Sequence, residues 1–469
     1  MDVWKNYKGQ SKSTQEAVPA SSAEDYTLMP KPQKKAKIKE TKKIKEVGAT
    51  QYTFENGIKC IFKKTDFKND FIVLYAVSMG GYFQHDGQEK ASASASREYA
   101  VFSGAGGKTN AQITKVVQGK RMQFGIGMDR TMAYFDATSN SENIEQTLQL
   151  INMNIRAPQF TDDAWKQVMD DFKQSAAGYG SKASQIYEEK INDLLYGKSP
   201  YYAPINNEFV SKMNQKNAER IYRERFADAD AFCFIFVGDF DEKKLLDLCA
   251  HYIGTLETDG KHDEPNWVHI PFPAKSQTIT VSKGDEKMGN IYMCFGGELA
   301  EEKDSEKNFM ESLIIKQLAA YLNIRLRDVI REEKSGTYTV NTTGNISGWP
   351  EREYKVDISF TCEPKRLEEL RQEVIKTINE MKAGKISEDI ITKLRESFIR
   401  ETESSLRDNY WWANRLLTEV WSETEPSWFT KNYNKIAREW ITSENILEAA
   451  KKYLDTNRIV TAYLKPEHN

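Results

Sequence analysis

The stretch "ASASASREYAVFSGAGG", residues 91–107, places small side chains on a segment that leads into one of the glycine-rich turns of the chain. Alternating Ala and Ser is typical of a flexible linker, but Tyr99, Val101 and Phe102 are too apolar for a solvated tether. The stretch therefore predicts a packed helix that ends at the glycines. A phosphate-binding loop is disfavoured, because the glycines follow a helix and lack the Gly-Lys-Ser/Thr ending of such loops.

Length and composition exclude several classes of protein. The chain has 469 residues, which is long enough for at least two hydrophobic cores. Its composition, with 29% charged and 39% hydrophobic residues, is typical of a globular protein. Its net charge of -3 does not favour binding of a polyanion by the chain as a whole. No apolar run approaches the ~20 residues of a membrane span. The polar start "MDVWK" has no signal-peptide core, so we expect no export by a leader in this sequence, which could still be a piece of a longer, exported chain.

The five cysteines form no Cys-x-x-Cys pair. Four of them, Cys60, Cys233, Cys294 and Cys362, lie inside apolar runs that are typical of strands. The sequence therefore predicts buried strand thiols that act as small hydrophobes, with no disulfide framework and no zinc knuckle.

Residues 1–47 differ in composition from the rest. The first 30 are polar and rich in Ser and Ala, and the Lys-rich run 31–46 follows. We interpret this region as a solvated linker, partly helical and partly disordered. A nucleic-acid-binding tail that acts through this Lys-rich run is the alternative, although acidic and apolar residues interrupt the run and no aromatic residue is interleaved. Steeply salt-dependent binding that is lost on deletion of the run would support the alternative.

The rest of the chain reads as two copies of one unit. Asn56-Gly57 between alternating runs predicts a hairpin, since both residues tolerate positive φ. A helix that begins after Thr161 recurs as one that begins after Ser387, a shift of about 226 residues (387 minus 161). Strands come first and helices follow in runs, which favours an α+β fold with two homologous repeats, each a largely antiparallel sheet covered by helices. We place the repeats at 48–262 and 263–469.

One aromatic pair also predicts packing. Trp411 and Trp412 are adjacent on an expected helix and therefore lie about 100° apart around its axis. We expect one of them in the core while the other faces a groove.

Several segments together resemble the insulinase/pitrilysin family of zinc peptidases. They are "NIRAPQFTDD", "DLLYGKSPYY", "YRERFADADAFCFIFVGDFD" and "LRDVIREEKSGTYTV", and the resemblance covers nearly everything from about Thr50 onward. It implies the insulinase-like α+β repeat in each unit. The family carries an inverted zinc motif, His-x-x-Glu-His, in which two imidazoles one helical turn apart bind zinc and the glutamate activates water.

This chain departs from that motif. The matching positions are Ala95-Ser96-Arg97-Glu98-Tyr99, so Glu98 is retained while Ala95 and Tyr99 replace the two histidines. The five histidines, at 85, 251, 262, 269 and 468, include no pair four residues apart. The family's third ligand is a glutamate about 75 residues further on, and no glutamate lies between positions 145 and 188. We therefore expect no metal ligands and no catalytic residues in this chain alone, with zinc held by a partner or an N-terminal half.

The resemblance also assigns a supporting role to two residues. Arg331 and Tyr338, in "REEKSGTY", match an Arg and a Tyr of the family's second half that reach the substrate beside the zinc. A phenol can donate a hydrogen bond to a developing oxyanion, and a guanidinium can bind a peptide carbonyl or carboxylate. We expect Arg331 to end a long helix and Tyr338 to begin a strand.

The resemblance thus implies a non-catalytic half of a zinc metalloendopeptidase. Such a half would wall the proteolytic chamber, bind extended peptide and supply Arg331 and Tyr338 to a zinc site on a catalytic half or partner subunit. We expect no nucleic-acid partner on this interpretation. An inactive scaffold or assembly subunit of the same family is the alternative. The compartment stays open between the bacterial periplasm and the cytoplasm.

Overall fold

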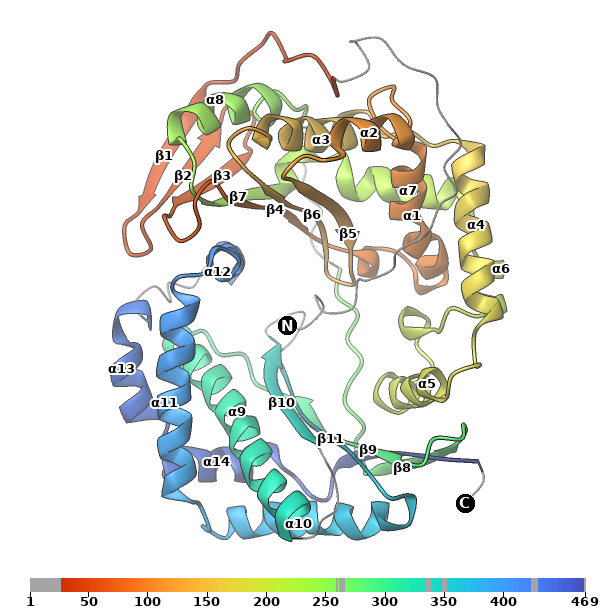
Figure 1. The fold of residues 1–469 in the computed structure, drawn as a ribbon, viewed down its shortest axis with the longest axis vertical. Coiled ribbons are helices and arrows are strands. Elements are labelled where there is room, and N and C mark those ends of the chain that lie inside the picture. Colours follow the sequence, from red (N-terminus) through yellow and green to blue (C-terminus); the bar gives the residue numbers. More distant parts are fainter. Residues whose placement is uncertain are drawn as a thin grey trace.

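Two units, each built from a β-sheet and its helices, make up the computed structural model (Figure 1). It describes residues 27–258, 260, 266–333, 339–347, 352–422 and 429–467. The first unit contains β1–β7 and α1–α8, and the second contains β8–β12 and α9–α14. None of the described helices is long and apolar enough to cross a membrane.

The two sheets repeat one strand order. The first sheet runs β1-β2-β3-β7-β4-β6-β5 and the second runs β10-β11-β9-β12-β8. The five strands β3-β7-β4-β6-β5 therefore correspond to β8-β12-β9-β11-β10. In each set one pair is parallel, β3 with β7 and β8 with β12, and the other pairs are antiparallel. The strands are β1 (Ile38–Ile44), β2 (Ala49–Phe54), β3 (Lys59–Lys64), β4 (Ile72–Met79), β5 (Gln123–Met128), β6 (Met132–Ser139), β7 (Phe232–Gly238), β8 (Gln277–Ser282), β9 (Gly289–Glu298), β10 (Val340–Ser347), β11 (Glu353–Cys362) and β12 (Ile459–Lys465).

This shared order confirms the predicted α+β class with two sheet-containing repeats. The predicted hairpin is present between β2 and β3, where Gly57 has a φ of 91° and the Phe54 amide donates to the Ile58 carbonyl at 3.0 Å. Thr161 and Ser387 cap equivalent helices, each accepting a hydrogen bond from a backbone amide three residues on. The proposed boundary between residues 262 and 263 stays a prediction, since residue 262 lies outside the described residues.

Helices cover one face of each sheet. Buried residues of α3, α7 and α8 pack on the first sheet, and those of α9, α10, α11 and α14 pack on the second. The helices are α1 (Lys90–Ser103), α2 (Asn110–Val117), α3 (Ile144–Arg156), α4 (Asp162–Ala177), α5 (Ala183–Tyr196), α6 (Asn207–Ser211), α7 (Gln215–Phe226), α8 (Glu242–Tyr252), α9 (Ser305–Leu326), α10 (Leu367–Lys382), α11 (Glu388–Ser405), α12 (Asn409–Ser422), α13 (Phe429–Trp440) and α14 (Ser443–Tyr453).

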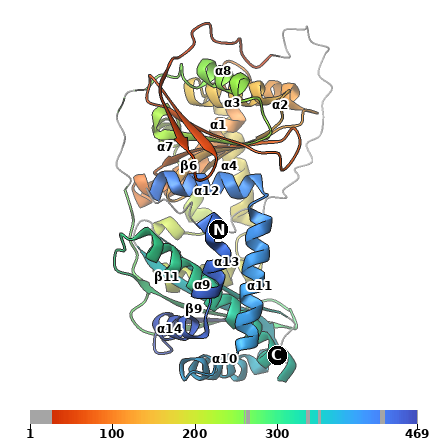
Figure 2. The same ribbon diagram turned by 90° about the vertical axis from the view of Figure 1, so that its left-hand side faces the viewer.

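The two units exchange equivalent helices. Helix α12 of the second unit lies on the other face of the first sheet, against β4 and β7 (Figure 2). Helix α5 of the first unit lies on the second sheet, where the Tyr187 hydroxyl donates to the Ala462 carbonyl at 2.8 Å. A helix of each unit thus buries apolar surface on the sheet of the other unit, and this burial stabilises the packing of the two units against each other.

All five cysteines are free and buried. Cys60, Cys233, Cys294 and Cys362 lie on β3, β7, β9 and β11 as predicted, and the fifth cysteine, Cys249, lies on α8.

The linker interpretation is wrong for the Lys-rich part of residues 1–47 that the structure describes. Ile38–Ile44 form β1, which pairs with β2 at the edge of the first sheet. Before it, Lys31 pairs with Asp247 of α8 at 3.2 Å, and the Ala36 amide donates to the Ala250 carbonyl at 3.0 Å. A row of lysines suits an exposed edge strand, because charged side chains discourage pairing with the strand of another chain.

Candidate functional site

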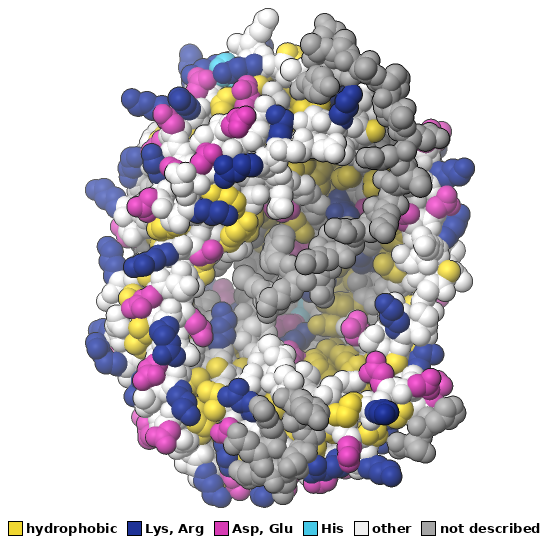
Figure 3. All heavy atoms as spheres, viewed as in Figure 1, with side chains coloured by type: hydrophobic (Ala, Val, Ile, Leu, Met, Phe, Trp, Pro, Cys, Tyr) yellow, Lys and Arg dark blue, Asp and Glu magenta, His cyan; other side chains and the backbone are white. Residues whose placement is uncertain are grey.

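The surface is hollowed between the two units, and apolar and charged side chains lie within this central hollow (Figure 3). The helix that matches the family's metal helix, α1, belongs to the first unit and packs against α4 and α7.

The side chains at the two positions where the family has histidines are buried in a helix interface. Ala95 is 0% and Tyr99 is 1% exposed, and both belong to an apolar cluster formed with α4 and the segment 209–218. The Tyr99 ring meets Phe160 and Trp165 edge-on, with ring centroids 5.1 and 5.2 Å apart. Its hydroxyl accepts a hydrogen bond from Gln215 Nε2 at 2.8 Å, and burial raises the pKa of Tyr99.

The remaining motif positions offer no metal-binding set in the part of the chain that the structure describes. Glu98, half-buried, forms an ion pair with Arg97 at 2.8 Å. Helix α4, at the place of the family's third ligand, buries Ala164, Val168, Phe172 and Ala176. Among the described residues, no three His, Cys, Asp or Glu side chains gather where they could hold a metal ion. The prediction that zinc is held elsewhere stays a prediction.

The glycines after α1 form a tight helix-ending turn. Gly104 has a φ of 91°, and its amide donates to the Ala100 carbonyl at 3.0 Å. A Cβ on Gly104 would lie 2.1 Å from the Lys108 carbonyl oxygen, so the turn requires glycine there. The predicted helix terminus is confirmed.

Arg331 and Tyr338 keep the status of predictions. The backbone of Arg331 lies in a π-helical segment, Arg327–Glu333, that directly continues α9. Its side chain and all of Tyr338 lie outside the described residues. Strand β10 begins at Val340, shortly after Tyr338.

The tryptophan pair lies where the two units meet. Trp412 is 6% exposed and packs on the first sheet, and its Nε1 donates to the Leu406 carbonyl at 3.0 Å. Trp411 is half-buried and contacts the cores of both units. The expectation of a core tryptophan is confirmed for Trp412.

A group of cations and tyrosines from both units, which we call the cation–tyrosine row, has no signature in the sequence. Two of its tyrosines lie in "DLLYGKSPYY", a segment that was noted only for its family resemblance. The adjacency of the row depends on how the two units pack, so no sequence spacing could have shown it. The row consists of Tyr82, Lys90, Arg130, Tyr196, Tyr202 and Lys355.

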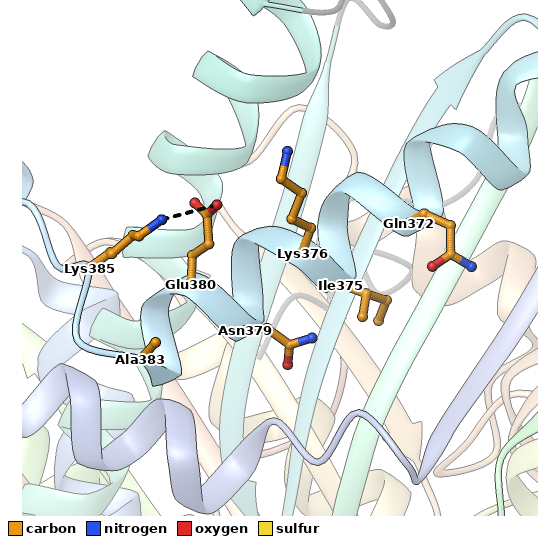
Figure 4. A pocket seen from close by; sticks show the side chains of 7 residues that line it. All are labelled: Gln372, Ile375, Lys376, Asn379, Glu380, Ala383 and Lys385. Atoms are coloured by element: carbon orange, nitrogen blue, oxygen red, sulfur yellow. Dashed lines mark ion pairs between the residues drawn. The ribbon is translucent and has the colours of Figure 1, made fainter.

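A separate depression lies along α10, remote from α1 and α12 (Figures 1 and 4). Its polar side chains come from α10 and the turn after it, and Lys385 pairs with Glu380 at 3.3 Å. Side chains of a single helix on an outer surface do not resemble a built site. The lining residues are Gln372, Ile375, Lys376, Asn379, Glu380, Ala383 and Lys385.

Comparison with known proteins agrees with this geometry. Residues 217–398 match the family model described as "Peptidase M16 inactive domain". The chain is 21% identical over 387 residues to a "Zinc protease PQQL-like" of Arabidopsis thaliana, covering 79% of this chain and 37% of the relative. It is 21% identical over 410 residues to the "Probable zinc protease PqqL" of Escherichia coli, covering 86% and 42%. The chain thus spans about two fifths of these curated relatives.

Solved structures share the fold. The periplasmic protease PqqL from Escherichia coli matches with a TM-score of 0.79 and 18% identity, covering 97% of this chain and 49% of that structure. A peptidase M16 inactive domain from Pseudomonas fluorescens matches with a TM-score of 0.71 and 16% identity, covering 89% and 98%. The first half of PqqL itself matches with a TM-score of 0.70.

The fold is that of the solved M16-like peptidases, and residues 217–398 match the inactive domain of this family. The chain carries a peptidase M16 inactive domain and is homologous to the PqqL zinc proteases, which confirms the resemblance to the insulinase/pitrilysin family.

Proposed function

We propose that this chain is the non-catalytic half of a zinc metalloendopeptidase. In this role it walls the chamber, binds extended peptide and supplies Arg331 and Tyr338 to a zinc site on the other half. The observation that carries the proposal is the packing of Ala95 and Tyr99, because both positions are committed to a helix interface on a fold that spans about half of PqqL.

Three further features support it. The match to an inactive domain favours pairing with a catalytic half. The central hollow between the two units offers concave surface to a peptide (Figure 3). The helical segment that contains the Arg331 backbone continues α9, and β10 is the next described strand, so in the sequence Arg331 and Tyr338 both fall between the end of α9 and the start of β10.

The test is reconstitution with the half that carries His-x-x-Glu-His. Tyr338→Phe removes one hydroxyl, and loss of one oxyanion donor should lower kcat about a hundredfold. Arg331→Ala should act partly on KM, since contacts to a peptide carbonyl exist in the ground state too. Tyr433→Phe, on α13, is the matched control and should leave kcat unchanged.

The alternative of a pure scaffold predicts another outcome. If the reconstituted enzyme keeps its kcat and KM with both Arg331→Ala and Tyr338→Phe, the two residues do not act on substrate. The chain would then hold an assembly together without touching the peptide.

A further inference from the structure

The cation–tyrosine row crosses from the first unit to the second. In the first unit, Lys90 Nζ lies 3.9 Å from the ring centroid of Tyr82. Arg130, in the turn between β5 and β6, has its Cζ 5.0 Å from the ring centroid of Tyr202. Cations held against tyrosine rings in this way are attracted by the negative face of the ring.

The row continues into the second sheet. The rings of Tyr196 and Tyr202 stack with centroids 3.7 Å apart and planes 10° apart. Lys355 of β11 donates to the Tyr196 hydroxyl at 2.7 Å and lies 4.4 Å from the same ring centroid. The row therefore holds three cations against tyrosine rings, two cations from the first unit and one from the second.

None of the three cations forms an ion pair within the part of the chain that the structure describes. No carboxylate oxygen of the described residues lies within 4.0 Å of Lys90, Arg130 or Lys355. Asp129, beside Arg130, is engaged in its own turn, because its Oδ1 accepts from the Thr131 and Met132 amides at 2.7 and 2.9 Å. This cluster stands out in a chain whose net charge is -3.

The row is also open to a ligand. Arg130 is exposed, while Lys90 and Lys355 are half-buried. Burial, with a smaller contribution from the positive charge of Arg130, lowers the pKa of Lys90 to about 8. An anion bound beside Lys90 and Lys355 would offset part of the cost of holding these half-buried cations away from bulk water.

We propose that the cation–tyrosine row binds an acidic side chain of a peptide held between the two units, so that the chain selects acidic peptides. The inference rests on the proposed peptide-binding function and deepens it. Guanidinium and ammonium groups form the stronger, charge-assisted hydrogen bonds to a carboxylate. Tyr196 and Tyr202 stack on each other, and their rings hold Lys355 and Arg130 in place to meet the carboxylate.

The test measures peptide binding by the full chain with fluorescence anisotropy. Two labelled peptides with amidated C-termini differ only in Glu against Gln, and a third, neutral peptide has a free C-terminal carboxylate. The acidic peptide should bind at least tenfold tighter than its Gln counterpart, as expected for charge-assisted contacts. Arg130→Gln or Lys355→Met should each remove most of that preference. Lys166→Met, an exposed position on α4, is the matched control and should keep it.

A charge-reversal variant distinguishes a change in charge preference from unfolding of the variant. Arg130→Glu should lower affinity for the acidic peptide and raise affinity for the same peptide with Lys in place of Glu, which an unfolded variant cannot do. If Glu and Gln peptides bind wild type equally, the row does not select acidic side chains, while peptide binding survives. If only the peptide with a free C-terminus binds, the proposal of a side-chain ligand is overturned. If no peptide binds, both the proposed peptide-binding function and this inference are refuted.

Discussion

Restoring histidines at positions 95 and 99 should destabilise this chain instead of creating a zinc site. Ala95 is 0% exposed, so the imidazole of Ala95→His must displace neighbours in a close-packed helix interface, which costs about 1–3 kcal/mol. Tyr99→His removes ring contacts with Phe160 and Trp165 and the hydrogen bond from Gln215, which costs about 2–3 kcal/mol more. The two positions face the same cluster, so the costs are not strictly additive, and we expect a total of about 3–5 kcal/mol.

The assay is urea denaturation followed by circular dichroism, with a chelator present so that metal binding cannot offset the loss. Arg97→His is the control on the same helix, and its half-exposed position should keep its effect within about 1 kcal/mol. The reasoning is refuted if the double variant is as stable as wild type and takes up one zinc ion per chain, because positions 95 and 99 would then face open space.

Two further predictions test other parts of the structure. Trp412→Ala should lower the free energy of unfolding by about 3–5 kcal/mol, since it removes a buried ring that joins α12 to the first sheet. Tyr410 is 42% exposed on the same helix, so Tyr410→Ala should lower it far less. Equal losses of the two variants in urea denaturation would contradict this packing. The lowered pKa of Lys90, about 8 against 10.5, means that the unfolded chain binds more protons between those values, so wild-type stability should gain from rising pH in that window. Lys90→Met should lack this gain, and identical stability–pH profiles of the two proteins would show that Lys90 titrates normally.

Much of the fold was predictable because it depends on local patterns. Asn56-Gly57 sets the β2–β3 hairpin, and Thr161 and Ser387 mark equivalent helix starts, so the repeat was visible in capping residues alone. The absence of paired histidines likewise needs only the sequence. The burial of Tyr99 adds the reason, since its side chain is part of a helix interface.

Features that depend on contacts between distant segments were not predictable. An edge strand that buries little of its surface lacks the alternation of apolar and polar residues that marks other strands. The Lys-rich run shows no such alternation, and for this reason its sequence does not predict β1. Lys90 and Lys355 are 265 positions apart (355 minus 90) and meet the same row of tyrosines only because α5 of the first unit lies on the second sheet.

The central claim is that this chain completes a zinc-bearing half, and one activity measurement tests it most directly. The isolated chain is incubated with a fluorogenic peptide and added zinc, and then titrated into the half that carries His-x-x-Glu-His from the same source. The account predicts no chelator-sensitive hydrolysis by the chain alone and a saturable increase of at least tenfold in the turnover of the other half. Chelator-sensitive hydrolysis by this chain alone, or an unchanged turnover at saturating chain, would contradict the claim.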